Sequence, residues 1–171
     1  AAAGSQIIYA PTFQAQPIAL KTVGMDAQTE KINEALVALS RSAAPGCLIA
    51  GDLTTLAVYC ESWNPDCFDL LVENYRRQIR GLIDGGADLL IGETLLYAQE
   101  AEAMYTFTMQ SDGALFSGAD GGKVLRDLEA AGAAAVGFNC VAADVLTPHL
   151  VSKLRRSVKI PLICKPNAGI P

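Results

Sequence analysis

Short apolar runs alternate with longer amphipathic stretches along this chain of 171 residues. The apolar runs predict strands at Gln6–Ala10, Leu48–Gly51, Leu89–Gly92, Tyr105–Met109, Ala135–Phe138 and Pro161–Cys164. The stretches with apolar residues at helical spacing predict helices at Asp26–Ala43, Cys67–Asp84, Leu95–Ala103, Gly122–Ala131 and Asp144–Ser157. Asp66 is expected to cap the second helix, and Asp144 to open the last one. Short strands that alternate with helices indicate a parallel sheet with both faces covered.

The ends of the predicted strands carry polar or metal-capable residues, which is where chemistry sits in parallel α/β proteins. This pattern favours an α/β fold of the (β/α)8 TIM-barrel type. Six strands are predicted where such a barrel needs eight, so residues 1–171 are predicted to form one barrel domain that is incomplete. Only nine residues, Leu95–Ala103, are available for the crossover after Thr94. A parallel crossover usually needs a dozen or more, so a deletion or break near Ala103–Met104 is also expected.

Composition narrows the functional classes. The net charge is -5, whereas a nucleic-acid surface needs clustered Lys and Arg, so we expect no nucleic-acid partner. No apolar run approaches the ~18 residues that span a membrane, and the start does not resemble a signal peptide. The five cysteines are odd in number and form no Cys-x-x-Cys pair. A disulfide framework is therefore unexpected, and a reducing, cytoplasmic location is predicted.

Five residues at the strand ends are candidates for function. Cys140 follows a buried-looking strand, and its thiol is either a reactive or metal-binding group or a buried structural one. Glu93 could bind a substrate ammonium group, or it could simply favour a helix start. Asn139 could orient a substrate or the neighbouring thiolate, or act as a turn former. Asp52 and Thr12 are further candidates for lining the same barrel mouth.

Two strand ends resemble a known family. Gly137-Phe138-Asn139-Cys140 and Pro166-Asn167-Ala168-Gly169 are similar to the motifs of the zinc-dependent homocysteine S-methyltransferases. That family includes the homocysteine-binding domain of cobalamin-dependent methionine synthase. The four earlier strand ends resemble the family's second to fifth strands in the same order. They are Gln6–Phe13, Ile49–Asp52, Ala87–Thr94 and Tyr105–Thr108. The resemblance therefore implies strands two to seven of the barrel, in a domain that is incomplete at both ends.

The resemblance implies an enzyme that methylates the thiol of homocysteine, with zinc holding that thiol as a thiolate. It implies that Cys140 is one of three cysteine ligands to the zinc, the other two belonging to a Cys-Cys run that this sequence lacks. It also implies that Glu93 binds the substrate ammonium group. The methyl donor that the resemblance implies is a corrinoid on a partner protein or domain, betaine or S-methylmethionine, and the motifs favour the corrinoid. The alternative is a non-catalytic fragment or degenerate barrel module without the zinc site.

The remaining chemically interesting residues are expected to have other roles. Cys164 is predicted to lie in the core, and Cys60 and Cys67 to be incidental loop cysteines. His149 is the only histidine and is expected to be solvated or packed, which gives Ser-His-Asp chemistry little support. A third hypothesis is a barrel lyase or aldolase, which needs a lysine at a strand end, and Lys165 is the candidate.

Overall fold

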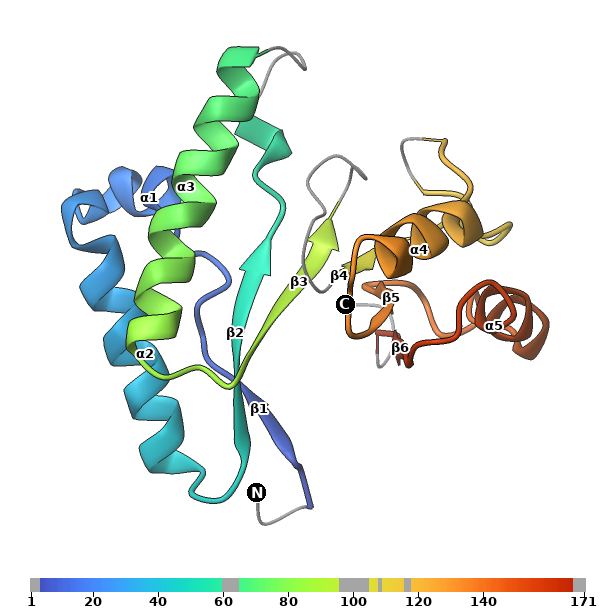
Figure 1. Ribbon diagram of the computed structural model, residues 1–171, viewed down its shortest axis with the longest axis horizontal. Coiled ribbons are helices and arrows are strands. Elements are labelled where there is room, and N and C mark those ends of the chain that lie inside the picture. The colour runs from blue at the N-terminus through green and yellow to red at the C-terminus, as the bar shows by residue number, and fades with distance from the viewer. Residues whose placement is uncertain (1–3, 60–64, 96–104, 108, 116–117, 168–171) are drawn as a thin grey trace. The chain divides into compact units, whose positions relative to one another are not determined.

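The computed structural model (Figure 1) describes residues 4–59, 65–95, 105–107, 109–115 and 118–167, which form strands, helices and the segments that connect them. The strands are β1 (Ile7–Tyr9), β2 (Leu48–Thr54), β3 (Leu89–Leu95), β4 (Tyr105–Phe107), β5 (Val136–Asn139) and β6 (Leu162–Lys165). The helices are α1 (Pro17–Leu20), α2 (Thr29–Ala43), α3 (Pro65–Asp84), α4 (Gly121–Ala130) and α5 (Pro148–Arg155). The chain divides into two compact units, Ala1–Ile91 and Gly92–Pro171, and β3 runs through the boundary.

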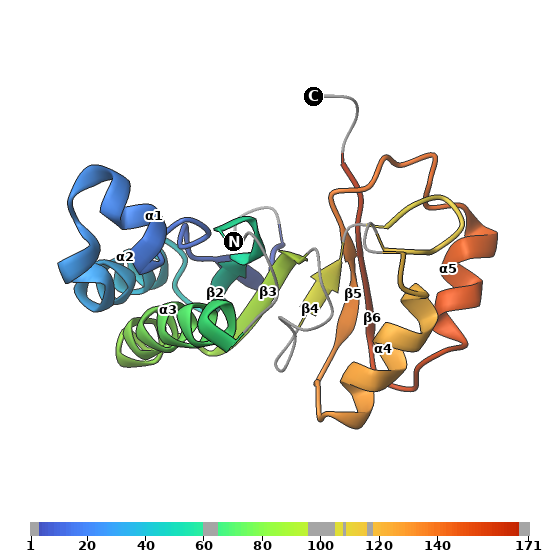
Figure 2. The same ribbon diagram turned by 90° about the horizontal axis from the view of Figure 1, so that it is seen from above.

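The first unit packs two helices against parallel strands. β1 pairs with β2 in the register Ile7↔Leu48 to Tyr9↔Ala50. β3 follows β2 in the strand order, and at its start the Asp88 amide donates to the Ile49 carbonyl at 2.8 Å. α2 and α3 lie side by side in both views (Figures 1 and 2). Apolar residues of the helices and strands meet in one buried cluster, made of Ala10, Val37, Ile49, Leu53 and Leu82.

The contact between α2 and α3 depends on a small residue and an ion pair. A Cβ added at Gly81 of α3 would overlap the carbonyl oxygen of Glu30 in α2, so the two helix backbones approach closely there. Beside this point the Arg77 guanidinium binds both carboxylate oxygens of Glu30, with Nε 2.6 Å from Oε1 and Nη2 2.7 Å from Oε2. The hydrogen bonds from Arg77 hold the pKa of Glu30 below its usual value.

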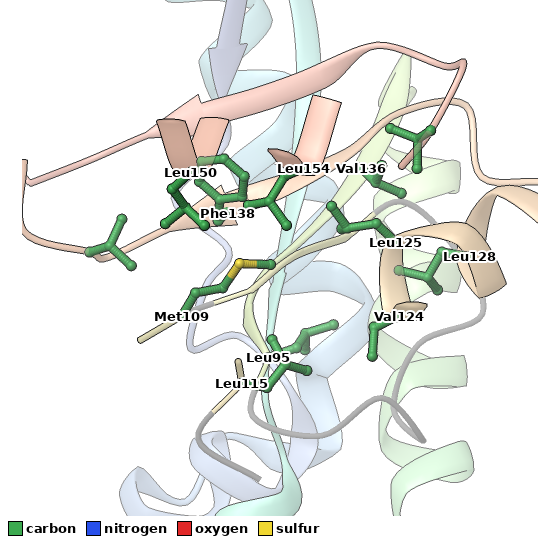
Figure 3. Packing of buried hydrophobic residues seen from close by; sticks show 12 residues of the cluster. Leu95, Met109, Leu115, Val124, Leu125, Leu128, Val136, Phe138, Leu150 and Leu154 are labelled. Carbon is green, nitrogen blue, oxygen red and sulfur yellow. The ribbon is translucent and has the colours of Figure 1, made fainter. Parts of the chain in front are cut away.

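The second unit is a parallel arrangement in the order β3-β4-β5-β6. β4 pairs with β5 from Tyr105↔Val136 to Phe107↔Phe138, and β5 pairs with β6 from Val136↔Leu162 to Asn139↔Lys165. α4 and α5 lie on the same side of β5 and β6 (Figure 2). Between these layers the side chains of Leu125, Phe138 and Leu154 are fully buried, and they belong to the larger apolar cluster shown in Figure 3.

The last helix begins later than the sequence predicts. α5 starts at Pro148, not at Asp144, and Thr147 precedes it in an extended conformation. The Thr147 hydroxyl accepts a hydrogen bond from the Leu150 amide at 3.2 Å, which satisfies one of the free N–H groups of the first turn. Proline is favourable at the first helical position because its missing N–H has no partner there in any case. Thr147-Pro148 was therefore a stronger signal for the helix start than Asp144. His149, the next residue, is exposed, as the sequence allowed.

α3 also departs from its expected start. It begins at Pro65, so Asp66 lies in the first turn and not at the cap position. There its negative charge still interacts favourably with the positive end of the helix dipole. α3 has 20 residues. Among the segments that the structure describes, neither this helix nor any other is both long and apolar enough to cross a membrane.

The predicted crossover helix after Thr94 is wrong at its first residue, because Leu95 is the last residue of β3. Leu95 is buried, only 2% exposed, and packs in the apolar cluster of the second unit. Its burial extends the strand beyond the polar pair Glu93-Thr94, where a sequence reading would end it. The rest of that predicted helix and the Ala103–Met104 junction fall in residues 96–104, outside the described part of the chain.

The cysteines differ from their expected states. Cys67 is buried and disulfide-bonded, so the prediction that it is incidental is wrong. Cys60 lies outside the described residues. Cys164 is exposed and does not belong to the core, because α4 and α5 bury its register partner Phe138 but leave Cys164 accessible. Cys47 is a free, buried thiol whose Sγ lies 3.2 Å from the carbonyl oxygen of Ser5.

Candidate functional site

Two strand ends in the second unit hold a strained backbone. Thr94 in β3 has φ 60° and Cys140, immediately after β5, has φ 53°. Among the described residues these are the only non-glycine positions with positive φ. Each such conformation costs on the order of 1–3 kcal/mol and persists only where the surrounding structure enforces it. Strain of this kind concentrates at functional sites, and here it brings a threonine hydroxyl and a thiol to face each other.

The buried amide of Asn139 enforces this arrangement. Its Oδ1 accepts from the Thr94 backbone N–H at 3.0 Å, and its Nδ2 donates to Thr94 Oγ1 at 2.8 Å and to Cys140 Sγ at 3.3 Å. Thr94 Oγ1 and Cys140 Sγ are 3.5 Å apart. Asn139 is 0% exposed, whereas Cys140 is exposed. One neutral side chain therefore ties the end of β3 to the end of β5 and fixes an accessible thiol at the edge of the strands.

An ion pair joins the two outer strands of the second unit. Lys165 Nζ of β6 donates to Glu93 Oε2 of β3. β4 and β5 lie between them in the strand order, and at ~4.8 Å per strand a flat sheet would separate β3 from β6 by ~14 Å. Long lysine and glutamate side chains can reach across this separation, so the pair links the two outer strands past β4 and β5. Lys165 lies opposite Asn139 in the β5–β6 register. The ion pair therefore occupies the same strand ends as the amide clamp, which is the set of hydrogen bonds from the Asn139 side chain to Thr94 and Cys140.

Thr12 and Asp52 form a separate pair in the first unit. Thr12 Oγ1 accepts from the Asp52 backbone N–H and donates to the Asp52 carbonyl oxygen, both at 2.9 Å. Gln78 Nε2 of α3 donates to the Thr12 carbonyl oxygen at 2.7 Å. The Thr12 hydroxyl thus ties the segment after β1 to β2. Asp52 lies within β2, which continues to Thr54, and so does not end the strand as the sequence suggested.

The predicted site residues thus fall into two groups, one in each unit. Asn139 and Cys140 both contact Thr94, and Glu93 directly precedes Thr94 in the sequence. Thr12 and Asp52 bind each other, and a cavity common to all five residues stays a prediction. Sequence reasoning missed Thr94 and gave Lys165 a different role. Both sit at strand ends, Thr94 directly after Glu93 and Lys165 directly before Pro166, and that position was the available signal.

The described residues supply only part of a zinc site. An exposed thiol at a strand end, such as Cys140, is a suitable zinc donor. A catalytic zinc needs three protein ligands, and among the described residues no three His, Cys, Asp or Glu side chains are grouped to hold a metal. Desolvation of the Cys164 thiol raises its pKa, which disfavours the thiolate that binds metal. The described residues therefore do not by themselves fit a zinc ion.

Comparisons with known proteins cover nearly the whole chain. The family model described as homocysteine S-methyltransferase matches residues 1–171. The homocysteine S-methyltransferase of Escherichia coli (strain K12) is 29% identical over 203 aligned residues, which include 98% of this chain and 64% of the relative. The crystal structure of the homocysteine methyltransferase MmuM from Escherichia coli, in its apo form, aligns with a TM-score of 0.74 and 25% identity over 98% of this chain and 68% of that chain.

The alignment with the curated relative also shows a difference in length. The chain spans about 64% of the length of that relative. The aligned stretch of 203 residues is longer than the 171 residues of this chain, so within it the relative carries residues that have no counterpart here.

Proposed function

Because this chain belongs to the homocysteine S-methyltransferase family, we propose that the protein transfers a methyl group to the thiol of homocysteine. The observation that carries the proposal is the clamp of Asn139 on Thr94 and Cys140, with the carboxylate of Glu93 beside it. It combines a fixed thiol, a strained backbone and a carboxylate at neighbouring strand ends. Methyl transfer to an amino-acid thiol needs a group that activates sulfur and a group that binds the ammonium end.

Cys140 is proposed as a zinc ligand, with the other ligands supplied by residues beyond those described. Bound zinc would supply the chemistry of keeping the acceptor thiol deprotonated at neutral pH. Asn139 positions the Cys140 sulfur through its 3.3 Å hydrogen bond. Glu93 binds the substrate ammonium group and so orients the acceptor. Thr12 and Asp52 are proposed to complete the substrate-binding wall.

The fold supporting this site is proposed to be a (β/α)8 barrel. The parallel order of the strands and the Glu93–Lys165 pair that links the outer strands of the second unit support that architecture. The candidate methyl donors are a methyl corrinoid carried by a partner protein or domain, betaine and S-methylmethionine. The assay below tests each of the three. Homocysteine is the expected small-molecule partner in each case.

The test is an assay of the full-length protein purified with zinc. Methionine formed from homocysteine is measured by mass spectrometry with methylcobalamin, betaine or S-methylmethionine as donor, and bound zinc is measured on the same sample. We expect transfer from one donor, and we expect Cys140→Ser to lose both zinc and transfer. Cys164→Ser is the matched control, because it removes another free, exposed thiol and should retain both properties.

Two results would contradict the proposal. Full zinc content and full transfer in Cys140→Ser would remove Cys140 from the site. Homocysteine binding without transfer from any of the three donors would favour the alternative, a non-catalytic module of the same fold.

A further inference from the structure

The Glu93–Lys165 ion pair has an uneven environment. The Glu93 side chain is only 12% exposed, whereas the Lys165 side chain is 46% exposed. A carboxylate with so little access to water is unfavourable unless a cation or hydrogen-bond donors compensate it. Lys165 supplies that charge from the accessible side, on a flexible four-carbon stem that can adopt other rotamers at low cost. Glu93 is therefore the fixed member of the pair, and Lys165 is the movable one.

We propose that Lys165 is a displaceable counter-ion that binds the carboxylate of the amino-acid substrate. This inference rests on the proposed function, in which homocysteine is the acceptor and Glu93 receives its ammonium group. A zwitterionic amino acid carries the same two charges as the ion pair. When it binds, its ammonium replaces Lys165 on Glu93, and the released Lys165 ammonium turns to the substrate carboxylate. Each charge keeps a partner, so the exchange leaves none of them uncompensated.

The exchange gives the site selectivity for amino acids. A ligand with an ammonium group but no carboxylate must displace Lys165 without offering it a new partner. A ligand with a carboxylate but no ammonium can engage Lys165 only by leaving Glu93 unpaired at 12% exposure. Lys165 would thus reject both kinds of analogue by the cost of an unpaired charge, which is how polar sites discriminate most strongly.

The experiment measures dissociation constants by calorimetry on the full-length, zinc-loaded protein and its Lys165→Met variant. The ligands are L-homocysteine, 3-mercaptopropylamine, which lacks the carboxylate, and 4-mercaptobutyrate, which lacks the ammonium group. Losing the hydrogen bond between Lys165 and the substrate carboxylate should reduce the preference for homocysteine over 3-mercaptopropylamine by about 10- to 100-fold. Most of this change should come from tighter binding of 3-mercaptopropylamine, because no lysine then competes with its ammonium group for Glu93. Homocysteine loses that competitor and the partner of its carboxylate together.

Two further variants serve as controls. Lys165→Arg keeps the cation and should bind homocysteine within about threefold of the unmodified protein. Lys123→Met removes another lysine from an ion pair, with Asp127, and should leave all three dissociation constants unchanged. Thermal unfolding of each variant reports whether it is folded, and if Lys165→Met is unfolded, the comparison rests on Lys165→Gln.

The outcomes separate this inference from the proposed function. An unchanged preference for homocysteine over 3-mercaptopropylamine in Lys165→Met overturns the role of Lys165 and leaves the methyltransferase proposal standing. Failure of the unmodified protein to bind homocysteine overturns both.

Discussion

Gly137 in β5 offers a sharp test of how closely the strands around the site are packed. It pairs with Ile163 of β6, and a Cβ added at Gly137 would overlap the Ile163 carbonyl oxygen. The same Cβ would lie 2.7 Å from the Ile163 carbonyl carbon and 2.8 Å from its Cβ. These are backbone and Cβ atoms, which no rotamer change can move. Alanine at this position therefore requires β6 to shift relative to β5.

The magnitude follows from two opposing effects. Replacing glycine by alanine at a compatible position stabilises by about 0.4–1 kcal/mol, because the unfolded chain loses freedom. Forcing an extra carbon into a closely packed place costs about 1–3 kcal/mol, and each strand hydrogen bond lost as β6 shifts costs about 1 kcal/mol more. The cost exceeds the gain, so Gly137→Ala should lower the free energy of unfolding by about 1–3 kcal/mol. The shift should also weaken homocysteine binding, since the β5–β6 register sets Asn139 opposite Lys165.

Gly51 in β2 is the matched control, because it is also a strand glycine. Its added Cβ would meet the Leu82 methyl carbons at 2.8 and 3.0 Å and Leu90 Cδ2 at 3.0 Å. These are the ends of flexible side chains that can rotate away, so Gly51→Ala should cost less than Gly137→Ala. Urea unfolding followed by circular dichroism measures both changes, with the slope of each transition checked for constancy. The reasoning is refuted if Gly137→Ala is as stable as the unmodified protein or if Gly51→Ala loses more.

Three other predictions concern the helix contact and the clamp. Arg77→Met should lower stability at pH 7 by less than about 1 kcal/mol, because the pair with Glu30 is partly exposed. The pKa of Glu30 is lowered in the folded state, so its contribution is full above the ordinary value of 4.5 and disappears as pH falls through the lowered one. As pH is lowered from 7 to 3, the urea midpoint should therefore fall less in Arg77→Met than in the unmodified protein. An identical pH dependence of the midpoint in the two proteins would contradict this. Gly81→Ala should lower the midpoint of thermal unfolding, because its Cβ would overlap the backbone carbonyl oxygen of Glu30. This cost should exceed the gain in helix propensity of about 1 kcal/mol. A higher midpoint would show that the two helices separate easily. Asn139→Ala should cost about 1–3 kcal/mol in urea unfolding, because the partly buried N–H and hydroxyl of Thr94 lose their Asn139 partner. A loss below about 0.5 kcal/mol would show that another group holds the strand ends.

Local patterns in the sequence predicted the order of the strands and helices. Apolar runs and helical periodicity depend on residues near one another in the chain, so they predicted the strands, the main helices and their parallel arrangement. They were less reliable at element ends. β3 extends to Leu95, and α5 begins at Pro148, because burial and capping decide the terminal residues. The strand-end motifs around Asn139 and Cys140 also indicated the family, which the match over residues 1–171 confirmed.

The tertiary structure alone decided how the site residues engage one another. Asn139 reaches Thr94 across 45 positions of sequence, and Lys165 reaches Glu93 across 72. No local pattern specifies partners at such separations, since they depend on which strands are neighbours and on how the sheet curves. The left-handed backbone of Thr94 and Cys140 has the same origin, because neither residue favours that conformation by itself. The sequence by itself thus determined the order of the strands and the position of Asn139 and Cys140 at the end of one of them, while packing between distant strands determined the contacts that the site residues make.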